Sequence, residues 1–301
     1  MRLILRRDSI LNGKIYWIIS ELWFRVLRKL STLGNKERYL TEGLHSSDSE
    51  ATQYLKSITA ILRREKSLSR FRRKMAYREI LEHLSYGDGL KYLKRIEELT
   101  SRDEALRLVH ANLVNDAFGQ PITFQYPIYG RVSATTLRYI STALEISQFT
   151  HILPTTSVVE IGCGYGGQAS VINRTFGVSN YTCFDLEPVL NLIEIFLEKT
   201  NSELEVKFGT FAESLPYWDL AISNYAFSEL SRELQIEYLE KVLSRSKAGY
   251  MIMNSGRTNL TGRSRGKLGI QEIREYLPGL KIHEEIPLTG PDNYVISWGN
   301  N

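Results

Sequence analysis

The spacing of apolar residues divides the chain into a helical first half and a second half in which strands and helices alternate. Between residues 50 and 118, apolar side chains recur at helical spacing, as in the series Leu55, Ile58 and Leu62. From residue 155 onward, short apolar runs alternate with amphipathic segments, which predicts a parallel, doubly wound sheet. The predicted strands span 158–161, 181–184, 204–208, 219–224 and 250–254, and the predicted helices span 168–172, 189–199, 232–243 and 271–276.

The end of the chain departs from this alternation. Residues 281–286 and 294–298 are two strand-like runs, and the turn between them is rich in Pro, Gly and Asp. Because no helix separates them, the two runs are expected to pair as an antiparallel hairpin. A dinucleotide-binding fold would continue with another crossover helix instead.

The segment 119–130 differs from both halves, since it holds two prolines, two tyrosines and a phenylalanine but no charge. The prolines exclude it from the interior of a helix. Tyr126 and Tyr129 fit two interpretations: substrate-binding rings that pack on a sugar, or buried rings in a connector between domains. After this segment, Ser133 is a candidate N-cap for a helix through Ile146.

These patterns predict three regions: a basic amphipathic helix within 1–45, a helical substrate or cap region at 46–150, and a cofactor domain at 151–301. The formal net charge of +4 conceals an asymmetry between the halves. Residues 1–150 hold 25 Lys and Arg against 16 Asp and Glu, whereas the remainder holds 13 against 18. The basic character therefore belongs to the N-terminal half.

Two basic stretches in that half each have two interpretations. Residues 10–33 predict an amphipathic helix that either contacts an anionic membrane surface or packs on its own domain or on a second copy of the chain. The run 63–74 suits either nucleic acid or a solvated helix face, and it lacks any recognised nucleic-acid signature. For the run 63–74 we therefore expect no nucleic-acid partner. For residues 10–33, both a contact with a second copy of the chain and a peripheral membrane contact stay open alternatives.

Cysteine content and hydropathy indicate a cytoplasmic protein. Whether it also contacts the inner face of the membrane stays an open alternative. The chain has only Cys163 and Cys183, which favours a reducing compartment. It also has no uninterrupted apolar run of about 18 residues, the length that a membrane-spanning helix needs.

The stretch 158–167 reads Val-Val-Glu-Ile-Gly-Cys-Gly-Tyr-Gly-Gly, which predicts a strand, a tight turn and the start of a helix. Glycines allow a ligand to approach the main chain, and the helix start favours an anionic or polar ligand. Gly162, Gly164 and Gly167 also match the dinucleotide spacing G-x-G-x-x-G. Glu160 favours a ligand with a cationic amino-acid group over a pyrophosphate.

The stretch "EIGCGYGG" resembles the first motif, E/D-x-G-x-G-x-G, of the class I S-adenosylmethionine (SAM)-dependent methyltransferases. Together with "CFDLE" and "NYAFSEL", it is similar to a bacterial family of sugar O-methyltransferases over roughly residues 120–300. The resemblance implies a Rossmann-like sheet of seven strands with a terminal antiparallel β-hairpin, and a helical N-terminal region. It also implies SAM as cofactor and methyl transfer to a sugar hydroxyl of a surface glycan or its activated precursor.

The resemblance also implies roles for individual residues. Asp185 would accept the ribose hydroxyls, with Glu187 as the alternative. Phe211 would stack on adenine, and Glu229 is the candidate general base. A first-turn carboxylate that only favours the helix dipole is the alternative for Glu229. The implied cofactor residues are Glu160, Gly162, Cys163, Gly164, Gly166, Gln168, Asp185, Leu186 and Phe211, and the implied catalytic residues are Glu229, Asn224 and Tyr225.

The loop "SGRTNLTGRSRGKLG" is basic and contains no acid. Its Arg263 and Arg265 are candidate substrate-binding residues for an acceptor with phosphate or carboxylate, such as a small or lipid-linked sugar. A solvated connector is the alternative. No His, Asp or Glu cluster has the spacing of a metal site, so no metal ligand is predicted. A divalent metal ion as an additional cofactor stays an open alternative.

Two other functions remain open. A NAD(P)-dependent oxidoreductase would explain the glycines and Asp185, but it would leave Glu160 and the terminal hairpin unexplained. A non-catalytic, methyltransferase-like scaffold in glycan assembly would explain the basic N-terminus.

Overall fold

The computed structural model describes residues 56–200, 204–209, 211, 215–254, 267–291 and 293–299. Its main sheet has seven strands in the order β5-β4-β3-β6-β7-β9-β8, and only β9 runs antiparallel to its neighbours. This arrangement confirms the predicted class I methyltransferase sheet with a terminal antiparallel hairpin. The strands are β3 (Ser157–Ile161), β4 (Asn180–Phe184), β5 (Val206–Phe208), β6 (Trp218–Asn224), β7 (Ser246–Met253), β8 (Lys281–Glu284) and β9 (Tyr294–Trp298).

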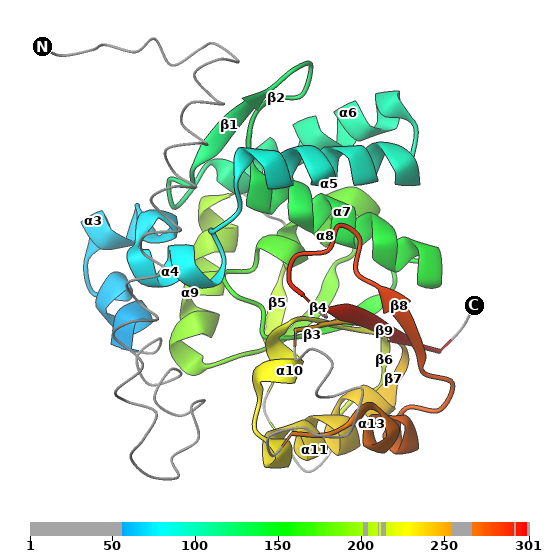
Figure 1. Cartoon of the computed structure of the whole chain (residues 1–301). Coiled ribbons are helices and arrows are strands. Elements are labelled where there is room, and N and C mark those ends of the chain that lie inside the picture. Colours follow the sequence, from blue (N-terminus) through cyan, green and yellow to red (C-terminus); the bar gives the residue numbers. More distant parts are fainter. Residues whose placement is uncertain are drawn as a thin grey trace, which may run out of the picture.

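The sheet is buried on both faces, which explains why its strands read as nearly continuous apolar runs. On β3, Val158 belongs to one hydrophobic cluster and Val159 to the other. Helices α7, α8 and α9 cover the first face, and α11 and α13 cover the second (Figure 1). These helices, with the short α10, are α7 (Ala134–Phe149), α8 (Gly167–Phe176), α9 (Glu187–Lys199), α10 (Ala226–Glu229), α11 (Arg232–Lys241) and α13 (Ile270–Tyr276).

The described part of the N-terminal half is helical, as predicted, apart from one hairpin. Its elements are a helix over 56–62, α3 (Glu65–Leu68), α4 (Met75–Ile80), α5 (Tyr86–Leu99), α6 (Arg102–Asn112) and the hairpin of β1 (Thr123–Tyr126) and β2 (Gly130–Ser133). Short 3₁₀ turns lie at η1 (Phe71–Arg73), η2 (Leu113–Asp116) and η3 (Leu243–Arg245). Ser133 caps α7 as expected, since its side chain accepts the N–H of Thr136 at 3.1 Å.

The N-terminal helices share a core with the sheet domain. The ring of Phe71 lies 5.5 Å from that of Tyr165 and 6.5 Å from that of Phe196. One cluster of buried residues therefore includes residues on both sides of residue 150, where the helical region was expected to end and the cofactor domain to begin. This domain boundary stays a prediction. The expected helix at 10–33 lies outside the described residues. None of the described helices is long and apolar enough to cross a membrane.

The structure corrects the expectation that Tyr126 and Tyr129 offer open rings to a sugar. Tyr126 is fully buried and stacks on Tyr86, with ring centroids 5.0 Å apart. Tyr129 is 4% exposed and donates its hydroxyl hydrogen to Glu97. The described structure thus favours the other interpretation, in which the rings of 119–130 are part of a buried connector.

The basic run 63–74 is also not uniform. Arg63, Lys66 and Arg73 are exposed, as a solvated face predicts, but Arg72 is fully buried. Its guanidinium donates to Glu82 at 2.6 Å and to Asp116 at 3.1 Å. This residue therefore stabilises the packing of the helical region rather than presenting charge to a partner.

Candidate functional site

The glycine turn lies between β3 and α8, where it was predicted. Gly162, Gly164 and Gly166 have φ of 74°, 59° and 84°, in the region that residues with a Cβ rarely adopt. All three positions are also closely approached by other segments, Gly166 by Cγ2 of Ile193 at 3.0 Å from its Cβ position. A Cβ at Gly162 would lie 2.0 Å from the Cβ of Ala226, and one at Gly164 would lie 3.0 Å from Cδ1 of Leu81.

Asp185 lies beside this turn, at the carboxyl end of β4. Its Oδ2 accepts the N–H of Cys163 at 2.7 Å and its Oδ1 accepts the N–H of Leu186 at 2.8 Å. Burial raises the pKa of Asp185 to about 6, although these backbone hydrogen bonds oppose the rise. The structure therefore brings together an acceptor carboxylate and the bare main chain of the turn.

Glu160 lies inside the core, two residues before the turn. It is 2% exposed, and its Oε2 accepts the hydroxyl hydrogen of Tyr181 at 2.7 Å. Burial raises the pKa of Glu160 to about 8, and the hydrogen bond from Tyr181 opposes that rise. Within the described part of the chain, no group donates to its other oxygen, Oε1.

Two further predicted residues meet between α8 and β6. The Nδ2 of Asn224 donates to Oε1 of Gln168 at 3.3 Å, and the Nε2 of Gln168 donates to the carbonyl of Tyr139 at 3.1 Å. The amide oxygen of Asn224 is buried and accepts no hydrogen bond from any described residue. Asn224 therefore keeps an acceptor available at the carboxyl end of β6.

Leu186 and Phe211 lie farther along the same edge of the sheet. Leu186 is 40% exposed at the start of α9. The ring of Phe211 packs 5.7 Å from that of Phe184 and 4.8 Å from that of Tyr238. Its contact with adenine stays a prediction.

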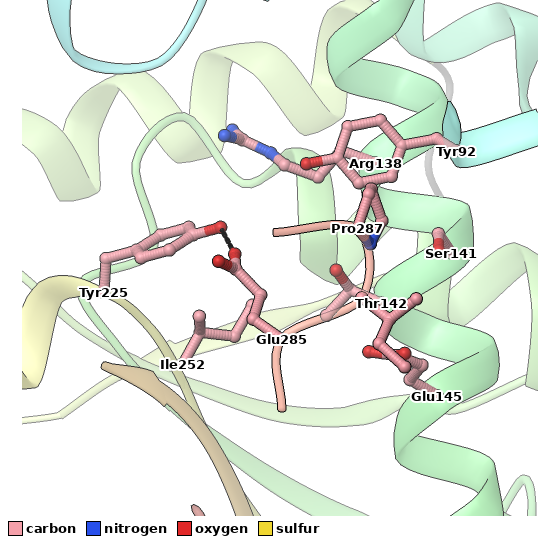
Figure 2. A pocket seen from close by; sticks show the side chains of 10 residues that line it. Tyr92, Arg138, Ser141, Thr142, Glu145, Tyr225, Ile252, Glu285 and Pro287 are labelled. Carbon is pink, nitrogen blue, oxygen red and sulfur yellow. Dashed lines mark hydrogen bonds between the residues drawn. The ribbon is translucent and has the colours of Figure 1, made fainter. Parts of the chain in front are cut away.

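Tyr225 follows β6 directly and has a strained backbone. Its φ of 71° and ψ of −32° are unusual for a residue with a Cβ, and such strain persists only where the surroundings enforce it. Its N–H donates to the carbonyl of Ile252 at 2.8 Å. The hydroxyl donates to Oε1 of Glu285 at 2.5 Å (Figure 2).

Glu285 is held in place from its other side. It is 6% exposed, and its Oε2 accepts the N–H of Thr289 at 2.9 Å. Burial raises the pKa of Tyr225 and Glu285 adds to the rise, while Arg138 opposes it. Tyr225 is therefore a neutral hydrogen-bond donor to the carboxylate of Glu285.

The expected base, Glu229, lies elsewhere. It is exposed, and its Oε1 accepts a hydrogen bond from Nδ2 of Asn254 at 2.6 Å. The carboxylate that the structure places at Tyr225 is Glu285, from the β8–β9 connection. The role of Glu229 as general base therefore stays a prediction, and the structure places a different carboxylate at Tyr225.

A small pocket surrounds the Tyr225–Glu285 pair at the carboxyl ends of β6 and β7, the edge where open α/β sheets bind ligands (Figure 2). Most of its lining is polar. Its polar side chains come from α5, α7, the residue after β6 and the β8–β9 connection: Tyr92, Arg138, Ser141, Thr142, Glu145, Tyr225 and Glu285.

Tyr92, Arg138 and Glu285 were not recognised from the sequence. They come from three distant segments, and none belongs to a motif. The one local signal is a single charge within an apolar stretch, as for Arg138 between Leu137 and Ile140.

Arg263 and Arg265 lie outside the described residues. Their neighbour Lys267 donates to the carbonyl of Ser228 at 2.6 Å. Within the described residues, no group of three or more His, Cys, Asp or Glu side chains could hold a metal ion.

No protein-family model and no curated protein matches the chain. Three solved structures illustrate the likeness in fold. The pyocyanin biosynthetic protein PhzM is 14% identical with a TM-score of 0.40, and the match covers 56% of each chain. The plantazolicin methyltransferase BpumL, in complex with SAH, is 15% identical with a TM-score of 0.40, over 71% of this chain and 97% of that one. Magnesium protoporphyrin IX methyltransferase (ChlM) from Synechocystis PCC 6803, with bound SAM, is 12% identical with a TM-score of 0.41, over 56% and 78%.

Likenesses at this level do not assign a function. The matched region spans little more than half of PhzM. The function is therefore inferred from this chain's own sheet order and site.

Proposed function

We propose that the chain is a SAM-dependent methyltransferase that methylates a hydroxyl group of a small polar acceptor. The observation that carries this proposal is the contact between the glycine turn and Asp185, at 2.7 Å, within a sheet that ends in an antiparallel hairpin. A nicotinamide-dependent oxidoreductase would share the turn and Asp185, but it would not account for the hairpin or for Glu160.

The residues at the turn fit the cofactor. Asp185 would hold the ribose hydroxyls, since a carboxylate accepts hydrogen bonds from both. Glu160 would hold the ammonium group through Oε1, which no described residue occupies, and the bound cation would lower the raised pKa of Glu160 so that its carboxyl group ionises. When bound, the cofactor supplies a methyl group on a sulfonium, which is an electrophile.

The Tyr225–Glu285 pair would serve the acceptor. Glu285 would accept the proton of the acceptor hydroxyl, and the bound cofactor would supply the methyl group to that oxygen. Tyr225 would orient this carboxylate. Alignment of the reacting groups supplies on the order of 7 to 11 kcal/mol, and a general base adds roughly 10² to 10⁴-fold.

A sugar hydroxyl, in a surface glycan or its activated precursor, is the acceptor we propose. Hydroxyl groups of Ser141 and Thr142 on α7 line the pocket and suit a ligand rich in hydroxyls. The pocket volume of about 10 Å³ admits about one water molecule, so the pocket would have to widen to admit a sugar. For a lipid-linked acceptor, residues 10–33 would bring the enzyme to the cytoplasmic face of the membrane. Flotation of the full chain with anionic vesicles, compared with neutral ones, tests that contact.

Calorimetry of the full chain with SAM and with NAD tests the cofactor. SAM should bind, and Asp185→Asn should weaken its binding by roughly 1.5 to 3 kcal/mol because hydrogen bonds to a charged group are lost. Glu187→Gln is the matched comparison, since Glu187 is an exposed carboxylate two residues away and the alternative partner of the ribose. It should keep the affinity, and a loss confined to this variant would transfer the ribose contact from Asp185 to Glu187. Binding of NAD without SAM would instead favour the oxidoreductase. SAM binding without turnover on a glycan pool would favour a scaffold.

A further inference from the structure

Arg138 on α7 is buried but has no carboxylate partner in the described structure. The residue is 6% exposed. Its one hydrogen bond runs from Nη2 to the carbonyl of Leu81, at a long 3.4 Å. Its guanidinium also lies 5.4 Å from the ring centre of Tyr139. These neutral contacts do not balance its charge.

Arg72 shows how the same chain treats a buried arginine that belongs to the fold. Its guanidinium has two carboxylate partners, Glu82 and Asp116, besides a backbone carbonyl. A buried charge without a partner is costly, so native proteins pair such groups. Arg138 is therefore placed to receive an anion that is not among the described residues.

The carboxylates near Arg138 are already engaged. Glu82 accepts hydrogen bonds on both oxygens, from Arg72 and from Thr135. Glu145 likewise accepts from Arg95 and from Tyr250. A third, Glu285, accepts from Tyr225 and Thr289. None of the three forms an ion pair with Arg138 within the part of the chain that is described.

A second unsatisfied group lies in the same pocket. Tyr92 is 4% exposed, and its buried hydroxyl has no hydrogen-bond partner among the described residues. Figure 2 shows the side chains of Tyr92 and Arg138 extending toward the part of the pocket that holds the Tyr225 hydroxyl. A hydroxyl and a guanidinium together supply the donors that a carboxylate or phosphate group needs.

We propose that Arg138 and Tyr92 form an anion subsite that binds a carboxylate or phosphate group of the methyl acceptor. This inference rests on the proposed function and narrows it to hydroxyl compounds that carry an anion, such as sugar acids or sugar phosphates. The anion lies against Arg138, while the hydroxyl to be methylated lies at Glu285. The sequence had assigned this role to Arg263 and Arg265, whereas the new subsite lies on α7 and α5.

The test uses the full chain without SAM and three probes at constant ionic strength: D-glucuronate, D-glucose 6-phosphate and D-glucose. Calorimetry and thermal unfolding measure binding. At least one anionic probe should bind tenfold or more tightly than D-glucose, and which one does so separates a carboxylate acceptor from a phosphate acceptor. Arg138→Gln should abolish the preference, and Arg138→Lys should retain part of it. Arg107→Gln, which removes an exposed charge on α6, should leave it unchanged.

Tyr92→Phe gives a second, milder variant in case Arg138→Gln does not fold. It should weaken the binding of the anionic probe several-fold without changing the binding of D-glucose. An unchanged preference for the anionic probe over D-glucose would count against the subsite. A wild type without any preference for an anion, or an Arg138→Gln variant that keeps one, overturns the inference.

A SAM titration of the same samples separates the two proposals. SAM binding without an anion preference defeats only the subsite. An anion preference without SAM binding supports the subsite and defeats the proposed methyl transfer.

Discussion

Tyr225 combines backbone strain with a charged partner. Its positive φ directs the hydroxyl to Glu285, which comes from a segment 60 positions away in the sequence. Strain of this kind costs of order 1 to 3 kcal/mol and is concentrated at functional sites. The fold thus maintains an unfavourable backbone at the residue that would orient the proposed proton acceptor, Glu285.

Replacing Glu285 tests its role as proton acceptor. Glu285→Gln should lower kcat by roughly 10² to 10⁴-fold because the amide cannot take the proton. Its affinity for SAM should stay unchanged. The measurement is methyl incorporation from labelled SAM into extracted glycan precursors, with calorimetry for the cofactor.

Glu229→Gln is the matched control, since Glu229 is an exposed carboxylate in α10, close after β6, the strand that Tyr225 follows. It should keep most of the activity. A loss confined to Glu229→Gln would restore Glu229 as the base and remove Glu285 from the mechanism.

The buried Glu160 predicts a pH dependence of stability. Its pKa is about 8 in the folded chain, above the ordinary value of 4.5, so the folded state binds the proton more tightly. Its contribution is therefore full below pH 4.5 and is lost as the pH rises to 8. In that window, the free energy of unfolding should fall by up to about 1.4 kcal/mol per pH unit.

Urea unfolding of the wild type and of Glu160→Gln, between pH 5 and pH 8, measures this contribution. The variant should lack the Glu160 part of the fall, so the two proteins should be most alike near pH 5, and the wild type should lose stability relative to the variant as the pH rises. Parallel curves would mean that Glu160 titrates normally and is not buried as described.

Elements were predicted where burial and local chemistry specify them. The strand 294–298 agrees with β9, and the helix cap at Ser133 is present, because two-sided burial and capping leave clear patterns. The hairpin of β1 and β2 was missed because Pro121 and Pro127 lie in its segment, and proline is unfavourable in strands. The glycine turn and Asp185 were each predicted from one contiguous motif. The pocket could not be predicted from the sequence, because Arg138, Tyr92 and Glu285 meet only in the folded chain.

Packing between elements also gives Gly162 a role besides ligand approach. Gly162→Ala should destabilise the chain because the new Cβ would lie 2.0 Å from Ala226, at the start of α10. Overpacking of this kind costs roughly 1 to 3 kcal/mol. Gly279→Ala is the control, since its φ of 78° is similar and no atom lies within 4 Å of its Cβ position. Equal losses in urea unfolding would show that backbone strain alone accounts for both.

At the scale of the molecule, the helical region and the sheet domain meet at the cofactor turn. Leu81 lies against Gly164, and the carbonyl of Leu81 accepts the hydrogen bond from Arg138. The next residue, Glu82, binds the buried Arg72. The segment that covers the turn is therefore fixed by the same ion pairs that hold the helical region together.

Arg72→Met tests whether the two regions fold as one unit. It leaves Glu82 and Asp116 buried without their cation, and breaking a buried pair in this way costs about 3 to 5 kcal/mol. Arg73→Met, at the exposed neighbouring position, should cost no more than about 1 kcal/mol, because it loses a single hydrogen bond to the carbonyl of Gln120. Because the core is continuous, circular dichroism and tyrosine or tryptophan fluorescence should report one coincident transition in each variant, and SAM affinity should fall with stability in Arg72→Met. Two separate transitions, with SAM bound as tightly as by the parent, would show instead that the chain divides near residue 150 and that the helices only cover a domain that is stable without them.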